Sequence, residues 1–410
     1  MRNPPAAGGV SARRHARSRV GDNEFMPLPP LVSPAAELTR EEVARYSRHL
    51  ILPEFGALAQ RRLKNARVLV IGAGGLGSPT LLYLAAAGVG TLGIVEFDTV
   101  EESNLQRQII HRTSDVGRSK ARSARDAIAD LNPLVAVDLH ECRLEPHNAV
   151  ALFERYDLIV DGTDNFATRY LVNDAAAIAR KPYVWGSVFG FGGQVSVFYD
   201  DAPDGRAVGY RDLFPEPPPP GAAPSCAEGG VLGVLCASIA SVMSTEAVKL
   251  ITGIGEPLLG RLMIYDALDM TYRTIAVRRD PAAPPITTLA DYDALCATAP
   301  GDDESSITPR RLREMLDSGA GVALIDVREP AEWEINRIDG ALLIPGSDIE
   351  SGQGMDRIPA GRIPVLYCKT GARSARAVAA LKSAGIGQAL HLRGGIVAWA
   401  DELDPDMARY

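Results

Sequence analysis

The chain has 410 residues and a formal net charge of −8, with 46% hydrophobic and 23% charged residues. This length has room for two domains, and the acidic balance argues against a nucleic-acid partner, which would favour a basic face. No apolar run reaches the roughly 18 residues of a membrane span, so no membrane association is expected. The cysteines form no CxxC pair, which predicts neither a disulfide framework nor a cysteine-held zinc and favours a reducing, cytoplasmic compartment.

Residues 1–37 have the composition of a disordered tail. Arginines lie among Pro, Ala, Gly and Ser, without the apolar centre of a secretory signal. A tail, or an over-extended start with Met26 as the true one, is preferred over an Arg-rich transit peptide. Order is predicted to begin at Thr39-Arg40-Glu41-Glu42, a capping-box pattern that starts a helix.

The stretch from Arg67 to Gly77 organises the sequence that follows. Its apolar run indicates a buried parallel strand, and the glycines after the run predict a turn that lets the backbone approach a phosphate. A helix continues through Leu81 to Ala87, and its free N-terminal N–H groups would point at that phosphate.

Polar side chains gather after the next predicted strand, at 91–96. Glu96 ends that strand, where a dinucleotide-binding unit places an acid on the ribose hydroxyls. Residues 98–108 are dense with potential ligands, and a predicted helix at 117–131 carries Lys120 early. This region therefore supplies candidate ligands for a nucleotide.

Strands and helices alternate through the first part of the chain. A buried strand at 157–161 runs into Gly162-Thr163-Asp164-Asn165, and further strands are predicted at 183–185 and 194–199. This alternation predicts an α/β fold with a Rossmann-like, mostly parallel sheet. Ligands of such sheets bind at the carboxyl ends of the strands, where these polar residues fall.

The segment 200–228 interrupts the alternation. It contains a run of prolines and has Cys226 near its end. Long loops without secondary structure are usually functional. A helix at 232–251 and strands at 262–265 and 272–277 then complete a first domain, predicted to span 38–280.

A second, smaller α/β domain is predicted at 306–410, after a linker at 281–305. One strand, at 322–328, ends in charged residues. Another, at 363–367, runs into Cys368-Lys369-Thr370-Gly371-Ala372-Arg373, and helix-forming residues follow.

The glycine turn by itself is weak evidence for one kind of enzyme. Gly72, Gly74 and Gly77 satisfy G-x-G-x-x-G, so a nicotinamide-dependent oxidoreductase is a fair alternative. The cations and amides after the second strand suit instead a triphosphate whose leaving pyrophosphate must be neutralised. Asp164 suits Mg²⁺, which takes a carboxylate or two together with phosphate oxygens.

Three separated motifs resemble, in the same order, the ubiquitin-activating-enzyme-like adenylyltransferases of the MoeB/ThiF family. They are Gly72–Gly77, Ser103–Gln108 and Asp161–Asn165, and Arg45–His49 resembles that family's N-terminal helix. The similarity covers about residues 38–280. Members adenylate the C-terminal glycine of a ubiquitin-like sulfur carrier protein that ends in Gly-Gly, so the resemblance implies ATP, Mg²⁺ and such a carrier.

The resemblance also implies roles for individual residues. Arg107, Lys120 and Asp164 would act in adenylation, with Asp164 holding Mg²⁺ and Asn165 beside the nucleotide. Arg48 would reach the phosphates bound by the other subunit of a homodimer. The residues expected to bind ATP are Gly72, Gly74, Gly75, Gly77, Glu96, Ser103, Asn104, Arg107, Gln108 and Lys120.

One departure from the family concerns zinc. Relatives often hold a structural zinc with two CxxC pairs, and the matching positions here are Gly209, Asp212, Ala283 and Ile286. None of them can be a cysteine ligand, so no zinc is predicted, and packing of the backbone is expected to hold that corner.

The second unit resembles a rhodanese domain over about residues 306–410. Asp326–Trp333 matches the first rhodanese signature, and Cys368–Arg373 matches the six-residue active loop. A thiol between a strand and a helix N-terminus, with Lys369 and Arg373 near, is poised as thiolate, and the same loop would stabilise a persulfide. The alternatives are a phosphatase, whose loop has five residues between Cys and Arg instead of four, and a buried inert cysteine.

Cys226 occupies the family position of a thiol that attacks the acyl-adenylate or resolves the acyl-persulfide. It lies in polar, loop-like sequence, unlike a core cysteine, and a bystander thiol is the alternative. The remaining cysteines, Cys142, Cys236 and Cys296, are interpreted as core or incidental.

The two halves together predict a bifunctional enzyme similar to the MoeZ type. It would adenylate the carrier, and Cys368, loaded as a persulfide by a desulfurase or thiosulfate, would form the carrier thiocarboxylate with help from Cys226 and Arg373. The pathway stays open between molybdopterin (molybdenum cofactor), cysteine, thiamine and another thiolated product. The alternatives are an NAD(P)-dependent oxidoreductase and a non-catalytic scaffold that binds the carrier.

Overall fold

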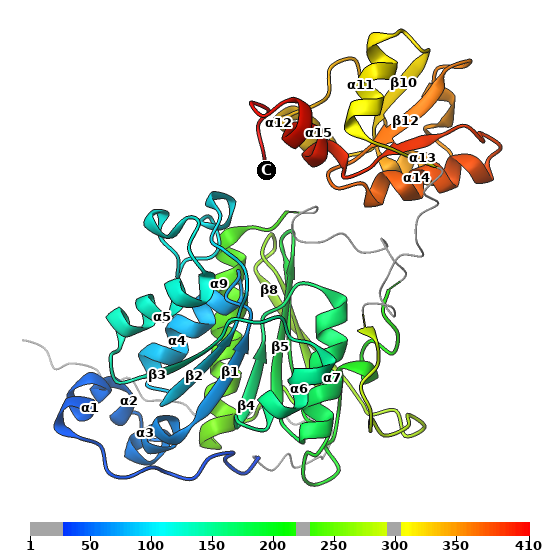
Figure 1. Cartoon of the computed structure of the whole chain (residues 1–410). Coiled ribbons are helices and arrows are strands. Elements are labelled where there is room, and N and C mark those ends of the chain that lie inside the picture. The colour runs from blue at the N-terminus through cyan, green and yellow to red at the C-terminus, as the bar shows by residue number, and fades with distance from the viewer. Residues whose placement is uncertain (1–27, 219–229, 293–304) are drawn as a thin grey trace, which may run out of the picture.

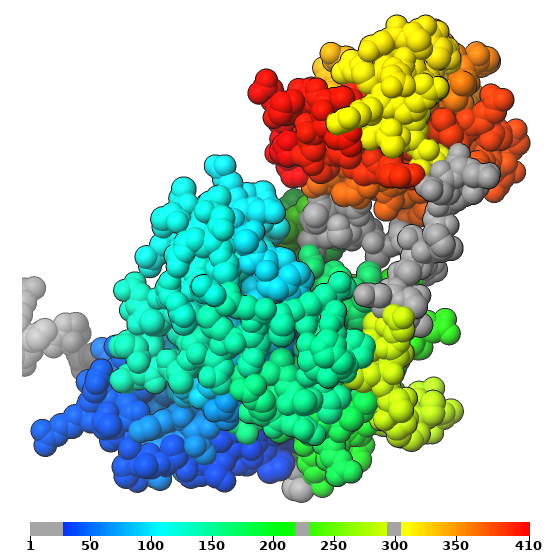
Figure 2. Space-filling model, viewed as in Figure 1, coloured from blue at the N-terminus to red at the C-terminus, as the bar shows by residue number. Residues whose placement is uncertain are grey.

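The computed structural model describes residues 28–218, 230–292 and 305–410. The Arg-rich start of the tail, Cys226 and Cys296 lie outside these ranges. The described residues form two α/β units, each with its own hydrophobic core, and the space-filling view shows them as two distinct bodies (Figure 2).

The first unit is built on an eight-stranded sheet in the order β3-β2-β1-β4-β5-β6-β7-β8 (Figure 1). The pairs from β3 to β5 are parallel, and the pairs from β5 to β8 are antiparallel. The predicted α/β class is confirmed, with an antiparallel extension that the sequence pattern did not reveal. The strands are β1 (Arg67–Ile71), β2 (Thr91–Val95), β3 (Ala136–His140), β4 (Leu158–Asp161), β5 (Tyr183–Phe189), β6 (Gly192–Phe198), β7 (Arg261–Asp266) and β8 (Thr271–Ala276).

Helices cover both faces of this sheet (Figure 1). On one face α9 packs against α3, α4 and the central strands, and α4 packs against α5. On the other face α6 packs against α7, which contacts β4. The helices are α1 (Arg40–Arg45), α2 (Ser47–Leu50), α3 (Gly56–Asn65), α4 (Gly77–Ala87), α5 (Lys120–Leu131), α6 (Pro146–Phe153), α7 (Phe166–Ala179) and α9 (Gly233–Thr252).

The capping box predicted at Thr39 is present. The Thr39 hydroxyl accepts a hydrogen bond from the Glu42 N–H at 3.2 Å, and the Glu42 carboxylate accepts one from the Thr39 N–H at 2.6 Å. The helix that it starts is shorter than expected, because Tyr46 leaves helical geometry between α1 and α2. Tyr46 is buried, and its hydroxyl accepts a hydrogen bond from the amide of Asn132 at 2.9 Å, so tertiary packing interrupts the helix.

One helix, α9, is an exception to the expectation that no apolar segment is long enough to cross a membrane. The 20 residues of α9 include a window of mean hydropathy 1.6, which by length and composition alone would be enough to cross a membrane. More than half of this window, 56%, is buried inside the fold. The apolar side chains of α9 therefore serve the core of the first unit, against β5 and α4.

The second unit has a five-stranded sheet in the order β11-β10-β12-β13-β9, and all of its pairs are parallel. This confirms the smaller α/β domain that the sequence predicts. Its strands are β9 (Ser306–Ile307), β10 (Val322–Asp326), β11 (Leu342–Leu343), β12 (Ile363–Tyr367) and β13 (Leu390–Leu392). Its helices are α11 (Pro309–Asp317), α12 (Pro330–Ile335), α13 (Gly346–Glu350), α14 (Ala372–Ser383) and α15 (Gly395–Leu403).

A side-chain carboxylate, in addition to backbone packing, ties the corner where relatives often carry zinc. Asp212 accepts hydrogen bonds from the backbone N–H of Gly209 at 2.7 Å and of Asp280 at 2.9 Å. These bonds join the two chain segments that two pairs of cysteines would otherwise link. Nearby, Tyr292 is buried and donates to Asp174 at 2.7 Å, so the early part of the predicted linker packs on the first unit.

We expect Asp212→Ala to lower the free energy of unfolding by about 2 kcal/mol, because two backbone N–H groups lose a charged acceptor. Asp212→Asn, which keeps one acceptor oxygen, should lose less. Thermal unfolding followed by circular dichroism measures both. The prediction that no zinc is held here is tested in the same experiment: a chelator should leave the transition unchanged, and a lower transition temperature with chelator would contradict it.

Candidate functional site

A cavity lies at the carboxyl ends of β1, β2, β4 and β5. Strand order reverses between β1 and β4, and such a switch point is where open α/β sheets bind ligands. Many of the predicted nucleotide-binding residues line this cavity together: Gly72, Gly74, Gly75, Glu96, Arg107, Gln108, Lys120, Asp164 and Asn165.

The glycine turn can form only because two glycines pack against each other. A Cβ atom on Gly77 would lie 1.9 Å from the carbonyl oxygen of Gly72, and Gly72 itself has φ +88°. This close packing begins α4 directly beneath the turn. Near the start of α4, Ser78 already donates its N–H to the Gly74 carbonyl at 2.9 Å, and Pro79 has no N–H. The expected row of free helical N–H groups is therefore reduced, and it is the dipole of α4 that favours a negatively charged ligand at this end.

Glu96 braces the turn from the neighbouring strand. Its side chain is buried, and its carboxylate accepts hydrogen bonds from the N–H groups of Ala73, Phe97 and Asp98, each at 2.9 Å. The carboxylate predicted to meet a ribose therefore also holds the turn in shape. His111 completes this support, with Nε2 3.2 Å from the Ala73 oxygen, and burial lowers its pKa.

Two predicted cations, Arg107 and Lys120, line the cavity, and Arg107 is the more exposed of the two. Lys120 is 7% exposed and forms an ion pair with Asp98 at 3.3 Å, at the first turn of α5. Arg107 donates to the carbonyl oxygen of Ser103 at 3.0 Å. Both guanidinium and ammonium are thus oriented by neighbours from the 98–108 segment and can offset the charge of a polyphosphate.

The acidic side of the cavity follows β4. Asp161, the last residue of β4, accepts from the Thr163 N–H at 3.0 Å and hydroxyl at 2.7 Å, and burial raises its pKa. This turn presents Asp164 at the cavity, while Asn165 caps α7 by accepting from Thr168 at 2.8 Å. Among the described residues no three His, Cys, Asp or Glu side chains form a metal cluster. The Asp164 carboxylate at this cavity suits Mg²⁺, which takes one or two carboxylates and fills its remaining positions with phosphate oxygens and water.

Gln108 has an unpaired polar atom beside the cavity. It is 5% exposed, lines the cavity, and its Oε1 atom has no hydrogen-bond partner in the described parts of the chain. Buried polar atoms are rarely left unpaired, so a bound group with a donor is expected there.

Four residues predicted to bind the nucleotide do not line this cavity: Arg48, Gly77, Ser103 and Asn104. Asn104 is buried and caps a short 3-10 helix by accepting from the Glu101 N–H at 3.2 Å. Ser103 bonds to Glu101 at 3.3 Å and does not line this cavity. Arg48 is exposed on α2, a position that agrees with, but does not test, a role toward another subunit. Gly77 lies under the turn.

Sequence reasoning missed several residues that line the cavity, and two of them carry a charged or thiol side chain. Arg169 is buried in α7 and donates to the Thr163 carbonyl at 3.1 Å and to Ser187 at 3.1 Å. Cys236 is buried in α9 as expected for a core cysteine, yet it also lines the cavity, and a Cβ on Gly75 would lie 3.0 Å from its sulfur. Only tertiary contacts bring α7 and α9 to the glycine turn.

The second unit holds Cys368 directly after β12. The residue is fully buried, and its sulfur accepts hydrogen bonds from the Gly371 N–H at 3.1 Å and from the Ser374 hydroxyl at 3.6 Å. Gly371 can close this tight loop because its φ of +106° is accessible to glycine. The loop and the start of α14 therefore surround the sulfur with donors suited to a sulfur anion.

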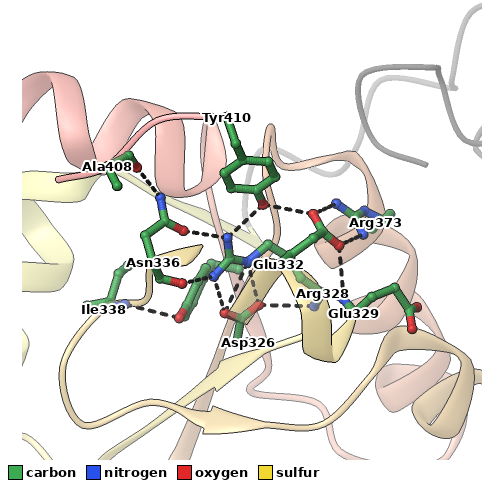
Figure 3. Close-up of polar contacts among 10 residues, drawn as sticks. Asp326, Arg328, Glu329, Glu332, Asn336, Ile338, Arg373, Ala408 and Tyr410 are labelled. Atoms are coloured by element: carbon green, nitrogen blue, oxygen red, sulfur yellow. Dashed lines mark hydrogen bonds and ion pairs between the residues drawn. The ribbon is translucent and has the colours of Figure 1, made fainter. Parts of the chain in front are cut away.

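The predicted cations of this loop have defined partners. Arg373 donates two bonds to Glu332, at 2.7 and 2.8 Å, as Figure 3 shows. Burial would raise the pKa of Glu332, but hydrogen bonds from Arg373, the Glu329 N–H and Tyr410 outweigh it and lower that pKa. Lys369 lies with its ammonium 4.3 Å from the centre of the Tyr410 ring.

Comparison with known proteins assigns a family model to each unit. The ThiF family matches residues 46–284, and the rhodanese-like domain matches residues 308–402. The chain belongs to the ThiF family. With the rhodanese-like domain that follows, it is an adenylyltransferase and sulfurtransferase.

Individual relatives resemble the enzyme over most of its length. It is 68% identical to the "Probable adenylyltransferase/sulfurtransferase MoeZ" of Mycobacterium tuberculosis, over 93% of this chain and 99% of the relative. It is 52% identical to the "Sulfur carrier protein adenylyltransferase" of Thermus thermophilus, over 63% of this chain and 98% of the relative. The crystal structure of E. coli MccB with ATP has the same fold, with a TM-score of 0.52 and 22% identity, covering 59% of this chain and 73% of that one.

We expect Gly77→Ala to destabilise the first unit by about 2 kcal/mol or more and to weaken ATP binding by about tenfold or more, because the methyl group would overlap the Gly72 carbonyl. Isothermal titration calorimetry and thermal unfolding measure the two effects. Gly192→Ala is the matched control, since a Cβ there would meet only ordinary contacts, the nearest at 3.7 Å. Unchanged ATP affinity in Gly77→Ala would contradict this account of the turn.

Proposed function

We propose that the enzyme uses ATP to adenylate the C-terminal glycine of a ubiquitin-like sulfur carrier protein and then replaces the adenylate with sulfur carried on Cys368. The observation that carries the proposal is the single cavity that brings the glycine turn together with Arg107, Lys120 and Asp164. The donors around the Cys368 sulfur in the same chain supply the second half.

In the first step, a carboxylate oxygen of the carrier attacks the α-phosphorus of ATP. The bond from that phosphorus to the bridging oxygen breaks, and pyrophosphate leaves with the electron pair. The N-terminus of α4 and the side chains of Arg107 and Lys120 would stabilise the charge that develops on the leaving group. Asp164 would hold Mg²⁺, which when bound neutralises and orients the phosphates.

An apolar rim beside the cavity supports a protein as the substrate. Phe189, Phe191, Leu232 and Val234 are exposed by 48%, 49%, 41% and 69%. They lie together because Leu232 donates to the Gly190 carbonyl at 3.1 Å. The neighbouring residues Val188 and Val231 line the cavity itself. Exposed apolar side chains that adjoin a site are typical of protein contacts, so a carrier could bind here with its tail in the cavity.

In the second step, the Cys368 thiolate attacks the sulfane sulfur of a donor. With thiosulfate, sulfite leaves and a persulfide forms on Cys368. The terminal sulfur of this persulfide then attacks the acyl carbon of the carrier adenylate, and AMP leaves. The Gly371 N–H and the Ser374 hydroxyl would stabilise the sulfur anion, and Arg373 contributes positive charge to the rim of the loop.

Release of the product needs a second thiol, for which we propose Cys226. Its thiolate would attack the Cys368 sulfur of the acyl disulfide, so that the carrier leaves as a thiocarboxylate and a Cys226–Cys368 disulfide forms. A thiol reductant would reopen that disulfide by exchange. Cys226 lies outside the described residues, so this role depends on its place in the sequence.

We also propose a homodimer in the cytoplasm. Arg48 is exposed beside an apolar groove whose lining includes Leu52, Phe55 and Tyr83, and Leu52 and Tyr83 are 50% and 54% exposed. A second copy seated on this groove would cover these side chains and bring Arg48 toward its phosphates. A desulfurase or thiosulfate would supply the sulfur, and the carrier would set the pathway, which includes molybdenum cofactor synthesis among the candidates.

The two activities should separate by mutation. We expect Cys368→Ala to lower thiosulfate:cyanide sulfurtransferase activity by about 10³-fold or more and to abolish the carrier thiocarboxylate, because the attacking sulfur is gone. Carrier-dependent exchange of pyrophosphate into ATP should stay at the wild-type level. Mass spectrometry of the carrier, which detects the exchange of an oxygen for a sulfur, reads the product directly.

The matched variant changes a residue of the first unit, where adenylation is proposed. Asp164→Ala should lower pyrophosphate exchange by about 10²-fold or more, because the metal-bound phosphates lose their anchor, with sulfurtransferase activity kept. Loss of both activities in either variant would contradict the division of labour. Exchange that does not depend on any Gly-Gly carrier would overturn the proposed substrate.

A further inference from the structure

The segment 404–410, at the end of the sequence, lies against the sulfur-transfer loop, and the proposed function gives it no task. The hydroxyl of Tyr410 donates to Glu332 at 2.8 Å and accepts from Arg328 at 2.7 Å (Figure 3). Its phenol therefore joins two ion pairs, Arg328 with Asp326 and Glu332 with Arg373. Such a bridge fixes one pair relative to the other.

The first ion pair, Arg328 with Asp326, is fixed in the interior of the second unit. Asp326 and Arg328 are both fully buried, and their closest contact is 2.6 Å. Burial would lower the pKa of Arg328, but its bonds with Asp326 raise that pKa, so the guanidinium stays charged and donates to Tyr410. Burial also raises the pKa of Tyr410, which keeps its hydroxyl protonated and able to donate to Glu332.

The second ion pair, Glu332 with Arg373, lies at the C-terminal end of the Cys368–Arg373 loop. Glu332 accepts both bonds from Arg373, the last residue of the loop, while its Oε1 atom also accepts from Tyr410. Tyr410 also contacts the N-terminal end of the loop, because the Lys369 ammonium lies 4.3 Å from the Tyr410 ring centre. One tyrosine thus contacts both cationic ends of the loop, directly or through Glu332.

Contacts other than those of Tyr410 also hold the segment in place. The Asn336 amide donates to the Ala408 carbonyl at 2.5 Å, and Met407 packs against the core of the second unit. The same Asn336 accepts from Arg328 at 2.8 Å. A built anchor of this kind indicates that the position of Tyr410 is specified by the fold.

We propose that Tyr410 is a positioning residue for sulfur transfer, which holds Lys369 and Arg373 where their charges attract an anionic sulfur donor to the Cys368 loop. This inference rests on the proposed role of Cys368. Tyr410 contacts no reacting atom, and the donors to the Cys368 sulfur, Gly371 and Ser374, belong to the loop itself. Loss of Tyr410 should therefore affect capture of the donor more than the chemical step.

The test uses the full-length enzyme with thiosulfate as the anionic donor and cyanide as the acceptor. Tyr410→Ala should raise the KM for thiosulfate about tenfold, because Lys369 loses its aromatic partner and Glu332 loses a hydrogen bond. Tyr410→Phe keeps the ring and should raise KM about threefold. In both variants kcat should stay within about twofold, and the KM difference should shrink at high salt, where the charges are screened.

Arg409→Ala is the matched control from the same segment. Arg409 pairs at 2.5 Å with Asp401, a residue of α15 that is not part of the loop, so its removal should leave KM unchanged. If Tyr410→Phe, which preserves the packing of the ring, shows wild-type KM at every salt concentration, the inference is wrong. A Tyr410→Ala variant with a lower unfolding temperature and unchanged KM would likewise reduce Tyr410 to a structural role. Cys368→Ala separates the two proposals, because retained activity there would overturn the role of Cys368 itself.

Discussion

The candidate nucleotide site depends on how Glu96 and the glycine turn hold each other. The carboxylate of Glu96, at the end of β2, accepts the N–H of Ala73 just after β1, so two adjacent strands are tied together at the edge of the cavity. Gly77 then packs against the Gly72 carbonyl, and α4 starts there. Because a backbone turn positioned in this way needs no reorganisation to meet a phosphate, its donors are ready before ATP binds.

The Cys368 loop of the second unit is built in a similar way to the glycine turn, but its backbone N–H faces a sulfur atom. A short loop follows β12, a glycine in the left-handed region closes it, and a helix begins at its end. The backbone N–H of Gly371 faces sulfur instead of phosphate. Here the supporting carboxylates, Asp326 and Glu332, hold arginines, so positive charge stays near the loop.

Joining these sites in one chain follows from the chemistry of a carboxylate. Sulfur cannot displace oxygen from a carboxylate directly, and adenylation converts that oxygen into part of a good leaving group. A persulfide is a strong nucleophile, and in the proposed function the buried donors around Cys368 would protect it until an acyl-adenylate arrives. The two units have separate cores, which is the basis for expecting that each activity can be changed by itself.

The sequence by itself determined the fold class and most of the candidate ligands, because local patterns specify them. An apolar run before glycines predicts β1 and its turn, and a cysteine between strand and helix predicts the Cys368 loop. Only tertiary structure decided that β6 to β8 pair in antiparallel fashion and that Arg169 and Cys236 line the cavity. The contact of Tyr410 with Glu332 joins residues 78 positions apart. No local pattern encodes such a contact, because it exists only when the fold brings α12 and the last segment side by side.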